Sequence, residues 1–513
     1  MTALPTLTAQ DLTQLAERGI TPAEAERQLA VLARPAAWAA LVRPCTPGDG
    51  LEVLSPAQID ELLAAHTRAA ARGRVSAFVP ASGAATRMFK DLLTARDLPG
   101  DLPPAAVRAA GDEASRALVR FADELPRFAF ARALGHVLAA RGHDLERVRT
   151  HGPWRVLLEG FLEPSGLDAA RAPKGQLLFH RDGDAARTAF EEHLIEAVAL
   201  TSGEDRVRRL DVTVSPEHRA GFERLVRDRV PALASLHGGT WQVVFSEQHP
   251  ATDTLAAAPE GGPFRDERGR LLFRPAGHGA LLRNLAESGR DLVFLKNIDN
   301  VAVRRLKAET GRWSRVLVGL AAELSDAIAA HVRGLRAGEP GAAERACAFA
   351  ARELGLALRP DERAEALASA LDRPVRVCGM VANTGEPGGG PFWVQGGTGV
   401  TRQIVESAQV DPGSPAQQAV LRAATHFNPV FIACALRDAD GRAHDLARFV
   451  DDAAVIVTRK SHGGRELMAL ERPGLWNGAM AHWHTRFVEV PLAVFNPVKT
   501  VFDLLRPEHQ GHS

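Results

Sequence analysis

The pattern of apolar and polar positions alternates between helical and strand-like stretches. Between residues 8 and 72, apolar side chains recur every three or four residues, which predicts helices interrupted by the proline-rich segment 43–50. An amphipathic helix is predicted at about 218–230. Short apolar runs predict strands at 75–79, 209–214, 241–245, 292–295, 376–381, 430–436 and 487–494. This rhythm of strand, helix and strand is typical of an α/β protein with a mostly parallel sheet.

Longer helical stretches separate some of these strands. The stripe of apolar residues from Trp313 to Leu335 predicts a long helix, and the glycine-rich segment 385–391 predicts a loop. We therefore expect a core that is interrupted by helical insertions. The expected regions are a helical N-terminal region at 1–74, a core at 75–302 with a helical insertion at 89–172, a second helical insertion at 303–372, and the C-terminal part of the core at 373–513.

The overall composition narrows the class of protein. The chain has 513 residues, and its 62 basic residues balance its 62 acidic ones, so we expect neither a nucleic acid nor a membrane as partner. The four cysteines are too scattered for a zinc site or a disulfide framework. No apolar run approaches the length of a membrane span and no signal-like segment follows Met1, so we expect a cytoplasmic protein. The oligomeric state is left open.

One stretch of small residues suggests a phosphate site. The sequence PASGAATRM at 80–88 follows a predicted strand and opens a predicted helix. Small residues let the backbone approach a bulky anion, which free N–H groups and an arginine can hold. A turn of this kind is also compatible with close packing of a strand on a helix.

Polar residues gather where other predicted strands end. They occupy 246–254, 274–279 and 296–300. In open parallel sheets, ligands bind outside the carboxyl ends of the strands. Asp299, which follows the strand at 292–295, is placed to bind Mg²⁺ with few other protein ligands. An Asx turn or a helix cap is the alternative role for this residue.

Several segments resemble, in the same order, those of a known enzyme superfamily. PASGAATRM resembles the glycine-rich signature of the sugar nucleotidyltransferases. FSEQHP at 245–250, PAGHG at 275–279 and NIDN at 297–300 resemble segments of the UDP-sugar pyrophosphorylases, and FNPVK at 495–499 resembles one of the UDP-N-acetylhexosamine pyrophosphorylases. The whole chain is similar to a bacterial family, a domain of unknown function, that is related to these enzymes.

The resemblance implies a GT-A-like fold, a mostly parallel mixed sheet flanked by helices, and it implies roles for individual residues. The implied nucleotide-binding residues are Ala81, Ser82, Gly83, Thr86, Gln248, Gly277, His278 and Gly279. The implied catalytic residues are Arg87, Lys174 and Lys499, although the PKG segment that carries Lys174 lies much farther along the chain than in the family. Asp299 would bind Mg²⁺, with Asn428 of the THFN segment as a weaker metal or sugar contact. Asn300 would contact the sugar. Glu386 is expected to contact the sugar because it is a polar residue of the glycine-rich loop, with capping of a turn as the alternative.

Lys499 has support from the chain itself. It ends an apolar run that contains two prolines, where an accidental charge is unexpected. We expect it to face the same cleft as Gly83, Arg87 and Asp299. A solvated position on the surface is the alternative for Arg87 and Lys174.

The expected reaction is that of a metal-dependent pyrophosphorylase. A nucleoside triphosphate, expected to be UTP, and a sugar 1-phosphate would give a nucleotide sugar and pyrophosphate. Two departures weigh against it: Ala85 stands where the signature has glycine, and Ser82 where it has glycine or alanine. A GT-A glycosyltransferase and a non-catalytic nucleotide- or sugar-binding protein therefore remain as alternatives.

Overall fold

The computed structural model describes residues 7–34, 38–83, 85–98, 102–183, 185–201, 203–385, 388–397 and 399–511. The chain forms two compact units, each built from separate stretches of sequence. Unit 1 consists of Met1–Phe78, Ser246–Leu295 and Ser314–Leu492. Unit 2 consists of Val79–Phe245, Lys296–Trp313 and Ala493–Ser513.

The main sheet of unit 1 is mostly parallel, as the sequence predicts. Its strands follow the order β2 (Thr46–Pro47), β3 (Gly50–Glu52), β19 (His484–Glu489), β12 (Val375–Ala382), β16 (Phe431–Ala435), β11 (Leu292–Lys296) and β4 (Val75–Pro80). The pairs β2–β3, β3–β19, β19–β12 and β11–β4 are parallel, whereas β12 and β16 run antiparallel. Buried side chains such as Phe78, Val293 and Ile432 form the core around these strands. The protein is therefore an α/β protein.

Smaller sheets complete unit 1. One has the order β1 (Leu41–Pro44), β13 (Gly389–Gly396) and β14 (Gly399–Glu406), and another has the order β10 (Phe273–Arg274), β9 (Thr254–Ala257), β18 (Arg465–Glu471) and β17 (Ile456–His462). The short strand β15 (His426–Phe427) pairs with β12. Two expectations are corrected here. The proline-rich break at 43–50 falls among the strands β1 to β3, and the loop predicted at 385–391 enters β13 at Gly389.

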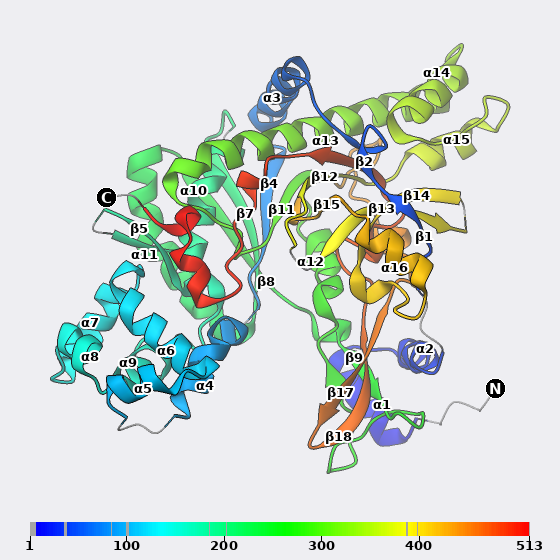
Figure 1. The fold of residues 1–513 in the computed structure, drawn as a ribbon. Coiled ribbons are helices and arrows are strands. Elements are labelled where there is room, and N and C mark those ends of the chain that lie inside the picture. Colours follow the sequence, from blue (N-terminus) through cyan, green and yellow to red (C-terminus); the bar gives the residue numbers. More distant parts are fainter. Residues whose placement is uncertain are drawn as a thin grey trace. The chain divides into compact units, whose positions relative to one another are not determined.

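Helices surround the sheets of unit 1. They are α1 (Ala9–Arg18), α2 (Pro22–Leu32), α3 (Pro56–Ala71), α12 (Leu281–Glu287), most of α13 (Lys307–Arg336), α14 (Ala342–Phe349), α15 (Ala364–Leu371) and α16 (Pro415–Arg422). Figure 1 shows α3 lying across α13. A Cβ at Gly319 of α13 would be only 2.0 Å from the carbonyl oxygen of Leu62 in α3. Glycine is therefore required where these two helices touch.

Unit 2 combines a few strands with many helices. Its strands are β5 (Leu178–Asp182), β6 (Ala185–Thr188), β7 (Val207–Val214) and β8 (Thr240–Glu247). Its helices are α4 (Lys90–Arg96), α5 (Pro104–Ala110), α6 (Glu113–Glu124), α7 (Ala131–Ala140), α8 (Leu145–His151), α9 (Arg155–Leu162), α10 (Ala189–Thr201) and α11 (Pro216–His237). The helices α4 to α9 form the cyan and blue group in Figure 1. Phenylalanines hold this group together: the rings of Phe130 and Phe161 stack with their centroids 4.3 Å apart.

None of the helices in the described ranges is long and apolar enough to cross a membrane.

Candidate functional site

Three charged residues from distant parts of the sequence meet in unit 2. Lys174 begins the short helical turn η3 (Lys174–Gln176), Asp299 follows β11, and Lys499 lies near the C-terminus. Lys174 Nζ is 2.7 Å from Asp299 Oδ2 and donates a second hydrogen bond, also 2.7 Å long, to the carbonyl oxygen of Val498. Lys499 Nζ is 3.4 Å from the same Oδ2. We call these residues the lysine–aspartate cluster.

The lysine–aspartate cluster carries one surplus positive charge. Burial by itself would raise the pKa of the Asp299 carboxyl, but the charges of Lys174 and Lys499 outweigh burial and lower this pKa. The carboxylate is therefore ionised at neutral pH and offsets one of the two ammonium groups. The Asp299 side chain is 9% exposed, whereas that of Lys499 is 58% exposed. The cluster thus presents its surplus charge to solvent and is suited to an anion such as a phosphate.

The backbone explains why these residues meet. The Val498 N–H donates a hydrogen bond of 3.1 Å to the Asp299 carbonyl oxygen, and the Asn496 N–H donates one of 2.8 Å to Asn300 Oδ1. These bonds fix the C-terminal segment beside the turn after β11. On the other side, a Cβ at Gly175 would lie 2.6 Å from the ring of Phe222. Glycine after Lys174 therefore lets the backbone come close enough for the lysine to reach Asp299.

We next consider whether the oxygen atoms of the cluster can bind the expected Mg²⁺. Among the residues that the structure describes, no group of three His, Cys, Asp or Glu side chains is placed to hold a metal ion. Both lysines contact Oδ2 of Asp299, and no described group makes a hydrogen bond to Oδ1. Mg²⁺ often uses only one or two carboxylates together with substrate phosphates. Asp299 therefore fits a metal ion that arrives with a phosphate substrate.

The small-residue stretch after β4 supplies fewer free N–H groups than the sequence suggests. Ala81 is buried, and its N–H donates a 2.8 Å hydrogen bond to the carbonyl oxygen of Thr213. Ser82 is half-buried, whereas Gly83 is exposed, and a Cβ added to it would meet no atom within 4 Å. Thr86 and Arg87 are exposed in the turn η1 (Ala85–Phe89). Ala84 lies outside the described residues.

Ala85 carries no backbone strain. The non-glycine residues with positive φ in the described chain are Asp168, Arg206 and Val430, so Ala85 does not adopt a left-handed conformation. Alanine is tolerated here without cost. The departure from the glycine of the signature is therefore no steric obstacle to this loop.

The predicted nucleobase loop lies in unit 1 and packs against its own chain. A Cβ at Gly279 would be 2.2 Å from the carbonyl oxygen of Pro473, and Gly277 has a positive φ of 73°. The ring of His278 stacks on Trp476, with centroids 3.9 Å apart and an interplanar angle of 14°. His278 Nδ1 accepts a 2.9 Å hydrogen bond from the Leu475 N–H. The close approach to Pro473 explains Gly279, and the positive φ explains Gly277, so neither glycine requires a ligand.

Polar groups that the sequence did not single out surround this stacked pair. His278 Nε2 is 3.7 Å from Glu406 Oε1, and this polar contact with His278 lowers the pKa of Glu406. Asn477 Nδ2 donates to Gln409 Oε1 at 2.9 Å and to Glu406 Oε1 at 3.3 Å. We call His278, Trp476, Glu406 and Asn477 the aromatic cluster. Because Glu406 and Asn477 belong to no local motif, the sequence held no signal for them.

The remaining predicted site residues have different surroundings. Gln248 is half-buried in unit 1. Asn428, also in unit 1, is buried, and its Oδ1 accepts a 3.1 Å hydrogen bond from the Val430 N–H, so the atom that a metal would need stabilises a turn. Asn300 in unit 2 is buried next to Asp299, and its Nδ2 has no hydrogen-bond partner among the described residues. Glu386 lies outside the described residues.

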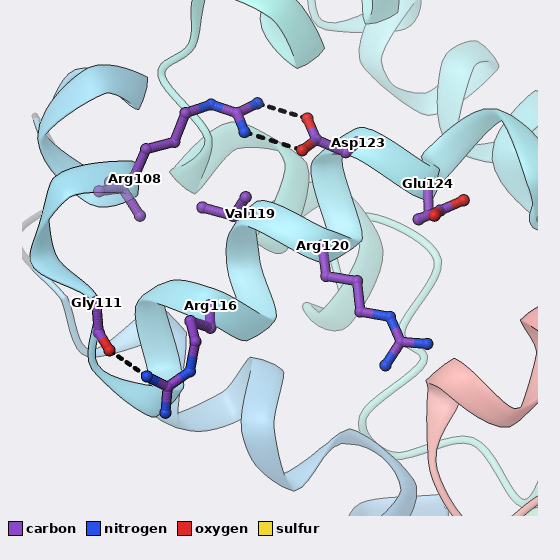
Figure 2. A pocket seen from close by; sticks show the side chains of 8 residues that line it. Arg108, Gly111, Arg116, Val119, Arg120, Asp123 and Glu124 are labelled. Carbon is purple, nitrogen blue, oxygen red and sulfur yellow. Dashed lines mark hydrogen bonds and ion pairs between the residues drawn. The ribbon is translucent and has the colours of Figure 1, made fainter.

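A separate hollow in unit 2 offers little for an anion. It has a volume of about 510 Å³ and is lined by α5 and α6. Figure 2 shows that Arg108 is paired with Asp123, and that Arg116 donates to the carbonyl oxygen of Gly111. The guanidinium of Arg120 lies 4.5 Å from the centroid of the Phe502 ring. Since these arginines already have partners, the lysine–aspartate cluster remains the stronger candidate.

Comparisons with known proteins define the family. Residues 8–510 match the model of the family described as "Domain of unknown function (DUF4301)", so the chain belongs to this family. Among curated proteins, no relative is found. Solved structures that are similar include the UDP-glucose pyrophosphorylase of Leishmania major, with 13% identity, 98% of this chain and 79% of that chain covered, and a TM-score of 0.45.

Another similar structure is the UDP-N-acetylglucosamine pyrophosphorylase of Trypanosoma brucei in complex with an inhibitor. It has 14% identity and a TM-score of 0.45, and the match covers 94% of this chain and 74% of that chain.

Proposed function

We propose that the protein is a nucleotidyltransferase that forms a nucleotide sugar and pyrophosphate from a nucleoside triphosphate, UTP in the first instance, and a sugar 1-phosphate. The observation that supports it is the meeting of Lys174, Asp299 and Lys499 in one cluster with a surplus positive charge. The three residues come from segments that were selected by their resemblance to one superfamily. Their proximity in the fold supports the proposal that they act together on one substrate.

The chemistry asks mainly for positioning and charge neutralisation. An oxygen of the sugar phosphate attacks the α-phosphorus of the nucleotide, a new P–O bond forms, and the bond to the β-phosphate breaks with its electron pair leaving on pyrophosphate. No side-chain nucleophile is needed. Lys499, which is exposed, would neutralise the attacking phosphate, while Lys174 is held in a fixed position by Asp299 and the Val498 carbonyl oxygen.

In this proposal, the protein would contribute one ligand atom to Mg²⁺. Asp299 Oδ1 would hold the ion together with the substrate phosphates, and the ion would supply further neutralisation of charge on them. Asp299 itself is not suited to act as a nucleophile or a base, because its lowered pKa and its two ammonium partners stabilise the carboxylate.

The direct test is a survey of pyrophosphate chemistry. The full chain is mixed with Mg²⁺, each nucleoside triphosphate and a set of sugar 1-phosphates, and pyrophosphate release is measured; the reverse reaction is followed with UDP-sugars and pyrophosphate. We expect activity in both directions with a uridine nucleotide. Sugar transfer from UDP-sugars without pyrophosphate chemistry would instead indicate the glycosyltransferase, and binding without turnover would indicate a binding protein.

A further inference from the structure

A second group of charged side chains is buried in unit 2. Its members come from β5, α10, the segment around the end of β11, α13 and the C-terminal turn η13 (Pro507–His509). They are His180, Glu192, His193, Glu196, Lys296, Lys307 and His509. The side chains of Glu192, His193 and Lys296 are 1%, 3% and 4% exposed. We call this group the buried network.

The charges in the buried network are matched. Lys296 Nζ lies 2.7 Å from Glu196 Oε2, and Lys307 Nζ lies 2.8 Å from Glu192 Oε2. A further contact of 3.6 Å between Lys307 Nζ and Glu196 Oε1 links the two pairs. Burial alone would raise the pKa of Glu192, but the charge of Lys307 lowers it to about 2. Two ammonium groups thus face two carboxylates, with no surplus charge.

One arm of the network reaches the turn that carries Asp299. His193 Nε2 is 3.2 Å from the carbonyl oxygen of Ile298. Because a carbonyl oxygen can only accept, Nε2 carries the hydrogen. Desolvation lowers the pKa of His193 to about 4, so the ring is neutral at neutral pH, and its Nδ1 is 3.9 Å from Glu196 Oε2. The imidazole therefore ties α10 to the peptide immediately before Asp299.

A second arm reaches the segment that carries Lys499. His180 Nδ1 is 2.9 Å from Glu192 Oε1, and His180 Nε2 is 2.9 Å from His509 Nδ1. The two rings are nearly parallel, with centroids 5.2 Å apart. Beside His509, the Val303 N–H donates a 3.1 Å hydrogen bond to the Glu508 carbonyl oxygen. The C-terminal segment is thus anchored to the same network.

Burying four charges is an expensive way to stabilise a fold, since well-packed apolar residues often serve equally well. The two arms of the network end at two of the three segments that form the lysine–aspartate cluster, those of Asp299 and Lys499. We propose that the buried network positions this cluster, with His193 acting as a positioning residue for Asp299 through the Ile298 carbonyl oxygen. The inference rests on the proposed function, because the positioning serves that reaction.

The experiment compares two replacements of His193. His193→Gln keeps an N–H donor that can reach Ile298, whereas His193→Leu removes the donor and keeps an apolar side chain. The matched control is His484→Leu in unit 1, because His484 is also buried, has a pKa lowered to about 4, and has its Nε2 2.9 Å from the carbonyl oxygen of Leu371. Amide hydrogen exchange of residues 297–303 is measured in all three variants, together with kcat and KM for pyrophosphorolysis.

In His193→Leu, we expect exchange at 297–303 to rise about tenfold, and kcat to fall about tenfold with KM nearly unchanged, the size of effect of one hydrogen bond. His193→Gln should show exchange at 297–303 and a kcat that are both close to the wild-type values. His484→Leu should lower the melting temperature without raising exchange at 297–303. Equal behaviour of the Leu and Gln variants, or an equal rise in exchange in the control, would overturn the proposal.

The exchange measurement also separates this proposal from the proposed function. If the wild-type protein shows no pyrophosphate chemistry, the proposed function fails. The response of residues 297–303 to His193→Leu and His193→Gln still decides whether the network positions the Asp299 turn.

Discussion

The buried network of unit 2 and the site of Arg376 in unit 1 bury cations in opposite ways. In unit 2, Lys296 and Lys307 are buried against carboxylates of matching charge. In unit 1, the guanidinium of Arg376 is fully buried without such a carboxylate among the described residues. It donates instead to three neutral oxygens, namely Thr485 Oγ1 at 2.8 Å, the Trp476 carbonyl oxygen at 2.8 Å and Gln403 Oε1 at 2.9 Å.

The difference extends to the two candidate clusters. The lysine–aspartate cluster of unit 2 has a surplus charge, which suits phosphates. The aromatic cluster of unit 1 has a stacked ring pair beside amide and carboxylate groups, which suits a flat uncharged ring. Arg376 contributes by holding the carbonyl oxygen of Trp476, whose ring stacks on His278. Binding of inorganic pyrophosphate is therefore expected to depend on the cluster of unit 2, and stacking of a flat ring is expected to depend on the cluster of unit 1.

The largest effect is expected from Asp299→Asn. The change removes the carboxylate that orients Lys174 and would hold the metal ion, so turnover should fall by roughly 10²–10³-fold, the loss typical of one preorganised electrostatic contact. Pyrophosphorolysis measured across a Mg²⁺ titration checks this. Turnover that remains unchanged at every Mg²⁺ concentration would show that the phosphate chemistry does not depend on this carboxylate.

A smaller effect is expected when the pH is lowered, which should reduce the stability of the folded protein. The pKa of His193 is lowered from 6.5 to about 4 and that of His509 to about 2, both mainly by desolvation, so these rings are neutral in the folded protein. As the pH falls below 6.5, these histidines become protonated in the unfolded chain but stay neutral in the folded protein. The free energy of unfolding therefore decreases. For His193 alone this loss reaches roughly 3 kcal/mol by pH 4, at about 1.4 kcal/mol per pKa unit.

Unit 1 contains His484, a buried histidine whose pKa is also lowered to about 4. Burial also lowers the pKa of His444 in unit 1, but the pKa of His509 in unit 2 falls furthest, to about 2, so unit 2 should open at a higher pH than unit 1. Amide hydrogen exchange of each unit between pH 7 and pH 4 measures the order of opening. Earlier opening of unit 1 would contradict this difference between the units.

The smallest effect is expected from Trp476→Ala. Stacking of a base on an aromatic ring contributes about 1–3 kcal/mol, so affinity for uridine nucleotides should fall roughly tenfold or somewhat more. Affinity for inorganic pyrophosphate should not change, because it has no base. Calorimetric titration of both ligands checks this pair of expectations. A parallel loss for pyrophosphate would remove the distinction between the two clusters.

The sequence predicted strands where apolar residues are continuous, and missed strands that lie open to solvent. The runs that became β4, β11 and β16 are buried almost throughout, and their pattern is plain. In contrast, β17 has no buried residue, so its sequence IVTRKSH resembles a loop. β17 pairs with β18 across the turn of Gly463 and Gly464, a local hairpin signal that the strand prediction missed, whereas β9, which pairs with β18 on its other side, is distant in the chain.

The candidate site was accessible to sequence reasoning only in part. Short motifs selected Lys174, Asp299 and Lys499, although no local pattern shows that three segments so far apart lie side by side. Arg376 lies in a predicted strand, where its complete burial has no sequence signal. The members of the buried network likewise become visible only once α10, the end of β11 and the C-terminal segment are folded together.

The most direct test of the account is the turnover of Lys499→Met compared with Lys90→Met. Lys499 has a 58% exposed side chain that contacts Asp299, and Lys90 is an exposed lysine at the start of α4 in the same unit. Both changes remove one positive charge and keep most of the bulk of the stem. We predict that Lys499→Met lowers the rate of pyrophosphorolysis by roughly 10²–10³-fold with little change in melting temperature, while Lys90→Met keeps the wild-type rate. Equal rates in the two variants would contradict the claim that the lysine–aspartate cluster binds the reacting phosphates.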